Sequence, residues 1–253
     1  VWIVDRYMTG EMEDEAERAV MTAESVFVKS LENRNRGYLA RYESVAQEAR
    51  FRVPAEIGDQ KTLEGVLGNL LQDAPDGHEA IVLVAVEGQK LASRRRSAGP
   101  DVEHFLQASA RVWQTALRGE AMLGAVSFDG RAYNAIAVPV SAPNGSFAGV
   151  LVIALRIGEP LATECKCPRT EVFLASGNQV VVATMPNAVT AAALVRPDAA
   201  ALAHVEIGGE HFIARPGLLD PADNSPAALR YLILSSYEQT LRTLRQTRWT
   251  LIF

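Results

Sequence analysis

The chain has 253 residues, of which 48% are hydrophobic and 22% charged, so it can fold around one large core or two modest ones. Its 30 acidic and 25 basic residues give a net charge of −5, which disfavours a polyanion such as nucleic acid as a partner. No internal run of about 18 consecutive apolar residues occurs, which excludes a self-contained transporter or channel.

Both ends of the chain are apolar and carry tryptophan, a residue that favours the membrane interface. The chain begins Val1-Trp2-Ile3-Val4 and ends Trp249-Thr250-Leu251-Ile252-Phe253. We expect these ends to be stumps of transmembrane helices. The alternative is that both ends pack on the core.

Apolar residues at steps of three or four predict one long helix over Val4 to Leu31. The stripe consists of Met8, Met12, Ala16, Ala19, Ala23, Phe27 and Leu31. Because it is narrow, it could pack against a second copy, and we expect a homodimer through this helix. Two asparagines and a glycine within 33–37 predict a kink or break, and the helical period resumes over 38–49, before Pro54.

Two further helices are predicted from their capping residues and spacing. Asp59 is placed to cap a helix with a leucine-rich buried side, which ends near residues 73–77. Asp101 is placed to cap a single helix that runs to Arg118 and is ended by Gly119. Between these helices, β-branched residues predict two strands, over 80–86 and 89–93.

Three strands in a meander are predicted after the second of these helices. The apolar runs Ala121–Phe128, Arg131–Val140 and Ser146–Arg156 are separated by Asp129-Gly130 and Asn144-Gly145. Both dipeptides are typical of two-residue hairpin turns, because asparagine, aspartate and glycine tolerate the positive φ angles that such turns need.

The second half of the chain repeats the first in shortened form. Val82–Ala85 parallels Val172–Ala175, Phe128–Tyr133 parallels Ile207–Phe212, and Val150–Ile153 parallels Arg230–Ile233. A shorter connection over 186–203 replaces the helical segment of the first unit. We therefore predict an α+β protein with two units of five antiparallel strands, and a last helix that begins near Tyr237.

This arrangement resembles the double Cache sensor family, the tandem PAS-like domains of bacterial receptors. The resemblance is carried by the helix Val4–Leu31, the hairpins at Asp129-Gly130 and Gly208-Gly209, and the segments 170–174 and 180–186. It implies four parts: an N-terminal signalling helix with a helical connection (1–58), a membrane-distal unit (59–158), a smaller membrane-proximal unit (159–236) and an exit helix toward the membrane (237–253).

The resemblance also implies a function. Such domains lie in the periplasm or outside the cell, anchored in the inner membrane by flanking helices of a histidine kinase, chemoreceptor or nucleotide cyclase. They bind a small molecule, usually in the distal unit, and pass the signal to a cytoplasmic output domain by helix displacement. Of the family's amino-acid-binding signature, only the fragment Arg111-Val112-Trp113 is present in order, which speaks against an amino acid as ligand. The alternative is a ligand-free interaction or assembly module.

Enzyme and cofactor motifs are missing from the sequence. It contains no phosphate-binding loop, dinucleotide fingerprint or nucleophile elbow, and His78-Glu79 lacks a second histidine at zinc-helix spacing. We expect no catalytic activity, no cofactor and no metal. Cys165 and Cys167 fit no four-ligand zinc pattern, and we expect two thiols.

The repeat singles out candidate binding residues, because a polar residue in one unit can face an apolar one in the other. Asn134 parallels Ile213, and a buried amide needs a partner from the protein or from a ligand. Tyr133 parallels Phe212, which favours a role in the core. Alternation along a strand places Ser127 with Asn134 on one face of the sheet and Arg131 with Tyr133 on the other.

The sequence does not say which of these faces meets the helix over 101–118. Arg131 or Arg111 could bind a small carboxylate through its forked guanidinium group. Trp113 is expected first in the core and second as a pocket wall. The expected ligand-binding residues are Asn134, Ser127, Arg131, Tyr133, Trp113 and Arg111.

Overall fold

The computed structural model describes residues 2–75, 77–185, 202–223, 225 and 228–236. The chain divides into two compact units, which we call the first-sheet unit (32–158) and the second-sheet unit (1–31 with 159–253). The predicted exit helix over 237–253 and most of the predicted connection over 186–203 lie outside the described residues.

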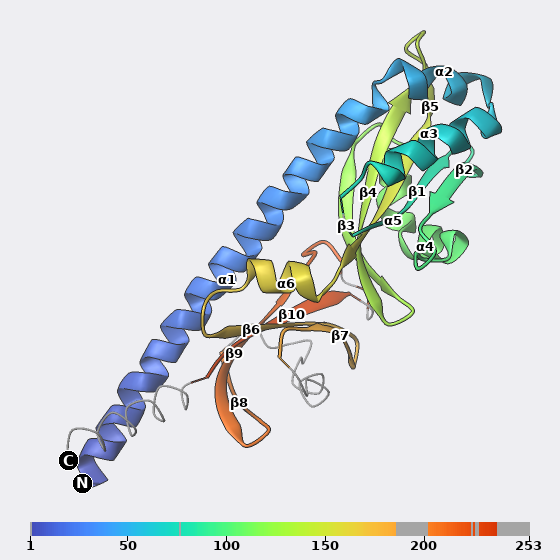
Figure 1. The fold of residues 1–253 in the computed structure, drawn as a ribbon. Helices are drawn as coiled ribbons and strands as arrows, with labels where there is room; N and C mark the ends of the chain where they lie inside the picture. Colours follow the sequence, from blue (N-terminus) through green and yellow to red (C-terminus); the bar gives the residue numbers. More distant parts are fainter. Residues whose placement is uncertain (1, 76, 186–201, 224, 226–227, 237–253) are drawn as a thin grey trace. The chain divides into compact units, whose positions relative to one another are not determined.

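The long helix α1 runs from Trp2 to Ala46 without interruption (Figure 1). The predicted break at 33–37 is therefore wrong. A glycine within a helix costs only about 1 kcal/mol relative to alanine. Burial of Tyr42 and Ala46, both fully inaccessible to solvent, outweighs that cost.

The apolar stripe of α1 packs within its own chain. Ala16 and Val20 form one buried cluster with Ile213, and the Phe27 ring lies 5.5 Å from the Tyr231 ring. The side chains of this stripe from Met12 to Leu31 are buried, except Ala19. The stripe therefore covers a sheet of the same unit, and its width is not an argument for dimerisation.

The first-sheet unit has one antiparallel sheet and four helices of its own. Its strands are β1 (His78–Val84), β2 (Lys90–Arg95), β3 (Met122–Phe128), β4 (Arg131–Ser141) and β5 (Phe147–Ile157), in the order β2-β1-β5-β4-β3. Its helices are α2 (Ala49–Ile57), α3 (Gln60–Gln72), α4 (Val102–Ala108) and α5 (Ala110–Ala116). In Figure 1 these strands are coloured from teal through green to yellow.

Helices cover both faces of this sheet, so the central strands are buried on both sides. On one face, Ile136 and Ile153 pack with Tyr42 of α1 and with leucines of α3. On the other face, Tyr133 and Val152 pack with residues of α4 and α5. The face that carries Arg131 and Tyr133 is thus the one that meets α4 and α5.

The segment predicted as one helix over 101–118 forms two. Asp101 caps α4 by accepting a hydrogen bond from the backbone N–H of His104, as predicted. The helix is interrupted at buried Ser109, whose hydroxyl donates to the carbonyl of Phe105 at 2.7 Å. A serine that bonds to its own backbone competes with the helical pattern, which accounts for the interruption.

Predicted turns and caps agree with the structure in most places. Asp129 and Gly130 both have positive φ, and Phe128 pairs with Arg131 across this two-residue turn. Asp59 caps α3 through the N–H of Thr62. The turn at Asn144-Gly145 is longer than predicted, because the N–H of Ala142 bonds to Ser146 O and leaves a three-residue loop.

The helix predicted to stop before Pro54 also differs from expectation. Helix α1 ends at Ala46, and a second helix, α2, includes Pro54 in its second turn. The proline carbonyl accepts from the N–H groups of Gly58 and Asp59, which closes the end of α2.

No helix in the described ranges is long and apolar enough to cross a membrane.

The second-sheet unit repeats the first sheet. It contains α6 (Glu159–Cys165), which the sequence pattern did not predict, and β6 (Thr170–Ser176), β7 (Gln179–Ala183), β8 (Ala203–Ile207), β9 (Glu210–Leu218) and β10 (Leu229–Ser236). Their order, β7-β6-β10-β9-β8, matches that of the first sheet strand for strand. The predicted α+β fold with two antiparallel five-stranded units is confirmed.

Candidate functional site

Buried polar atoms without a partner concentrate in the first-sheet unit. Among the described residues, four such side-chain atoms occur: the Tyr42 hydroxyl, His78 Nε2, Glu79 Oε2 and Asn134 Oδ1. An unpaired buried donor or acceptor costs about 1–3 kcal/mol. Each of these atoms therefore marks a place where a ligand, a water molecule or a rearrangement would supply a partner.

An aromatic cluster lies between the sheet and α4. The Phe128 and Tyr133 rings stack with centroids 5.1 Å apart, and Phe105 of α4 meets Tyr133 edge-on at 6.2 Å. Burial raises the pKa of Tyr133; Arg131 beside it lowers that pKa and Glu79 raises it. The phenol thus stays protonated at neutral pH and can donate a hydrogen bond.

Glu79 and Arg156 extend this cluster with charge. Glu79 is only 7% exposed, and its Oε1 lies 3.4 Å from Nη1 of Arg156 on the neighbouring strand β5. Its second oxygen has no partner. Arg156 pairs with Tyr133 across β4 and β5. A carboxylate, a phenol and two guanidinium groups therefore come together on the α4/α5 face.

The segment after β2 covers this cluster. Arg131 donates from Nη1 to the carbonyl of Ala98 at 2.8 Å, and the N–H of Arg96 donates to the carbonyl of Glu79 at 2.8 Å. Gly99 comes so close that an added Cβ would lie 2.4 Å from the Glu79 carbonyl oxygen. Residues 96–99 are thereby held over the acidic and basic groups, and only glycine fits at position 99.

Asn134 lies on the opposite face of the sheet, toward α1. It is 1% exposed, and its Nδ2 donates to Oδ1 of Asn35 at 3.3 Å. Ser127 is on the same face, because it pairs with Ala132, two residues before Asn134 on β4. The predicted division of these residues between the two faces is thus confirmed.

The remaining two predicted residues lie on α5. Trp113 is partly buried and packs against the apolar residues between α4, α5 and the sheet. Its indole N–H donates to the carbonyl of Leu106 at 2.8 Å. Arg111 is exposed. The structure therefore brings Arg131, Tyr133 and Trp113 to one face and leaves Asn134 and Ser127 on the other.

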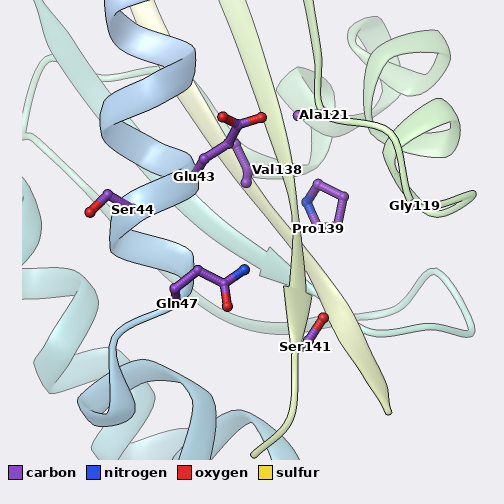
Figure 2. Close-up of a pocket in the computed structure, with 8 residues that line it drawn as sticks. All are labelled: Glu43, Ser44, Gln47, Gly119, Ala121, Val138, Pro139 and Ser141. Carbon is purple, nitrogen blue, oxygen red and sulfur yellow. The ribbon is translucent and has the colours of Figure 1, made fainter. Parts of the chain in front are cut away.

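An open groove lies elsewhere in the first-sheet unit. Its volume is about 500 Å³, and Figure 2 shows the α1 side chains Glu43, Ser44 and Gln47 opposite Pro139 and Ser141 of β4. Glu43 is its one charged lining residue, and none of its lining side chains has an unpaired buried atom. The groove offers fewer directed polar groups than the α4/α5 face.

Sequence reasoning missed Glu79, Arg156, His78 and Tyr42. A signal for the first was present, because a glutamate directly before the apolar run Ala80–Val84 is unusual at the start of a buried strand. The other three could not be found in this way, because their neighbours come from strands and helices far away in the sequence.

Solved structures with the same fold are sensor domains. The ligand-binding domain of the Pseudomonas fluorescens chemoreceptor CtaA, in complex with L-serine, has a TM-score of 0.55 and 18% identity, covering 88% of this chain and 97% of that one. The V. cholerae histidine kinase DctB sensor domain has a TM-score of 0.56 and 13% identity, covering 88% and 98%.

A third similar structure is the ligand-binding domain of the Campylobacter jejuni chemoreceptor Tlp3 in complex with L-norvaline. It has a TM-score of 0.54 and 14% identity, covering 91% of this chain and 92% of that one. No protein-family profile and no curated protein sequence matches the chain. At these identities the likeness concerns the fold alone: the chain shares the fold of these solved sensor domains.

Proposed function

We propose that this chain is the extracytoplasmic sensor region of a bacterial receptor of the histidine kinase, chemoreceptor or nucleotide cyclase type. The observation that carries the proposal is the duplicated five-stranded sheet that shares one long N-terminal helix. Solved sensor domains with this fold support it. An inner-membrane anchor, with the unit over 59–158 distal from the membrane and that over 159–236 proximal, belongs to the same proposal.

The ligand site of this proposal lies on the α4/α5 face of the first sheet. Glu79 offers an unpaired buried oxygen, which attracts an ammonium or another N–H donor. Arg131 and Arg156 offer guanidinium groups, which match a carboxylate. Tyr133 adds a hydroxyl donor, and Trp113 of α5 lies on the same face. Arg111 of α5 is a candidate for an outer contact.

This set of groups complements a small molecule that carries both an ammonium and a carboxylate group. The solved CtaA and Tlp3 domains are complexes with L-serine and L-norvaline, which are molecules of this kind. A small carboxylate without an amine would leave Glu79 Oε2 unpaired, so we expect weaker binding. The charges around Tyr133 support this ligand class.

Signal transmission would use α1, which contacts the sheet in each unit. In the first-sheet unit it binds β4 through Asn35 and Asn134. In the second-sheet unit, Glu24 accepts hydrogen bonds from Arg215 Nε at 3.0 Å and from the Tyr231 hydroxyl at 2.9 Å. A ligand that alters either sheet would displace α1 and, through it, the output domain.

Thermal shift of the purified fragment with amino acids, small carboxylates, amines and purines tests the proposal. A ligand at a hundred times its Kd stabilises the folded state by about 2.7 kcal/mol, which raises the Tm of a chain of this size by about 5–10 °C. We expect this shift for a zwitterion, and a smaller one for its deaminated carboxylate.

Variants of the site and of the surface distinguish specific binding from nonspecific stabilisation. Glu79→Gln and Arg131→Ala should each abolish the shift, whereas Glu206→Gln and Arg118→Ala, at exposed positions, should retain it. Loss of the shift in Asn134→Leu but not in Arg131→Ala would place the ligand under α1 instead. No stabiliser in the whole panel would favour the ligand-free interaction module.

We also propose a homodimer through α1. Met21 and Val26 of α1 are 54% and 42% exposed, so both are open to contact with a second copy. Sedimentation of the fragment at rising concentration should show a monomer–dimer equilibrium that Met21→Lys weakens. A monomer at all concentrations would contradict dimerisation of the isolated region.

A further inference from the structure

Three of the four unpaired buried atoms lie where α1 packs on the first sheet. They are the Tyr42 hydroxyl of α1, Nε2 of His78 on β1, and Oδ1 of Asn134 on β4. His78 and Asn134 both pair with Leu155 of β5, so they flank that residue on one face. The cluster is on the opposite face from Tyr133 and takes no part in the proposed ligand site.

His78 is enclosed by aromatic rings and has no exposed surface. The Tyr38 ring meets it edge-on with centroids 5.6 Å apart, and the Tyr42 ring lies 5.8 Å away. Its Nδ1 lies 2.8 Å from the carbonyl of Pro75. Because a carbonyl can only accept, Nδ1 carries the proton and unpaired Nε2 is the bare nitrogen of a neutral ring.

The charged groups with the largest effect on the pKa of the His78 ring are positive. Burial lowers the pKa of His78, the hydrogen bond to Pro75 opposes this, and the guanidinium groups of Arg41, Arg96 and Arg34 lower it further. Arg96 is fixed in place, because Nε donates to the carbonyl of His78 at 2.7 Å. The facing groups are Arg34, Tyr38, Arg41 and Tyr42 from α1, Arg96 from the segment after β2, and uncharged Asn134 from β4.

We propose that His78 makes the contact between α1 and the first sheet sensitive to protons, so that protonation of Nε2 loosens residues 34–46 of α1 from the sheet. A protonated ring would bring a second N–H with no partner and a positive charge into a site that already faces three arginines. Movement of α1 lets water reach the ring and relieves both penalties. This response would act independently of the small-molecule site.

The direction of the pH effect follows from linkage. An exposed histidine titrates near pH 6.5, and His78 in the closed contact titrates lower. Between the two values the opened state binds a proton and the closed state does not. Acidification below pH 6.5 therefore favours opening, by up to about tenfold per pH unit.

Two measurements on the wild-type fragment test the proposal directly. NMR titration of the His78 ring should give a pKa below 6.5, the ordinary value of an exposed histidine. Hydrogen exchange, corrected for the intrinsic effect of pH, should show protection of residues 38–46 falling about tenfold per pH unit below 6.5. Residues 170–176 of the second sheet serve as an internal reference and should keep their protection.

Substitutions separate the histidine from general acid effects. His78→Phe keeps an aromatic ring but cannot titrate, so protection over 38–46 should become independent of pH between 7.5 and 5.5. His104→Gln and His204→Gln should retain the wild-type response. A His78 that titrates at or above 6.5, or the same pH response in His78→Phe, would overturn the proposal; if His78→Phe does not fold, the wild-type titration decides.

Discussion

The two sheets share one topology but differ in how they hold α1. In the second-sheet unit, Ile213 packs on Ala16 and Val20 and is fully buried. The corresponding residue of the first sheet is Asn134, which binds α1 through one amide hydrogen bond and keeps Oδ1 unpaired. The repeat therefore preserves the strand order while the polarity of the contact with the helix changes.

The polar contacts of α1 show the same difference. In the second-sheet unit, Glu24 accepts from both Arg215 and Tyr231, so these polar groups are paired. In the first-sheet unit, the Tyr42 hydroxyl is buried without a partner, and burial raises its pKa to about 12. The second sheet thus holds α1 by satisfied contacts, whereas the first holds it by contacts that a proton, a water molecule or a rearrangement could improve.

The largest effect on stability is expected when a polar residue is placed in the apolar contact of the second sheet. Ile213→Asn removes a buried aliphatic side chain and leaves an amide unpaired against Ala16 and Val20, so we expect a loss of about 3–4 kcal/mol in the free energy of unfolding. Urea denaturation measures this. A loss below about 1 kcal/mol would mean that the second sheet tolerates a polar contact as the first does.

A smaller effect is expected from two matched tyrosine variants. Tyr231→Phe removes a hydroxyl that donates to Glu24 at 2.9 Å and should cost about 1–2 kcal/mol. Tyr42→Phe removes a hydroxyl that has no partner and should be neutral or slightly stabilising. Denaturation of both variants at pH 7.5 compares them, and equal costs would contradict the difference between the two contacts.

The smallest effect is expected where the apolar residue replaces the polar one. Asn134→Leu removes an unpaired buried oxygen but also the hydrogen bond to half-buried Asn35, which water can then satisfy. We expect the unfolding free energy to stay within about 1 kcal/mol of wild type or to rise. A loss above about 2 kcal/mol would show that the bond to Asn35 is a main support of α1.

Local signals predicted much of the fold. Asp59 and Asp101 cap helices as their sequences indicate, and Asp129-Gly130 forms the two-residue turn that its positive φ angles require. These features depend on a few adjacent residues. The break predicted at 33–37 is absent, because the helix depends there on tertiary packing and not on adjacent residues. Burial of Tyr42 and Ala46 outweighs the weak helix propensity of glycine and asparagine.

The candidate sites were predicted only in part. Alternation in β3 and β4 assigned Ser127 with Asn134, and Arg131 with Tyr133, to separate faces. It could not assign a helix to each face, because the pattern is the same whichever helix covers it. Glu79 and Arg156 join Tyr133 only through strand pairing, and His78 meets Tyr38 and Tyr42 only because α1 packs on β1.

The amino-acid sequence by itself indicated the duplication, the caps and one tight turn, since caps and turns depend on adjacent residues and the duplication appears as repeated segments. The tertiary structure decided that α1 is continuous, that its apolar stripe covers its own sheet, and that four side-chain polar atoms of the described residues are buried without partners. Those properties arise from contacts such as Asn35 with Asn134, which are 99 residues apart. No local pattern encodes such a contact, because its energy exists only when the helix and the sheet are packed together.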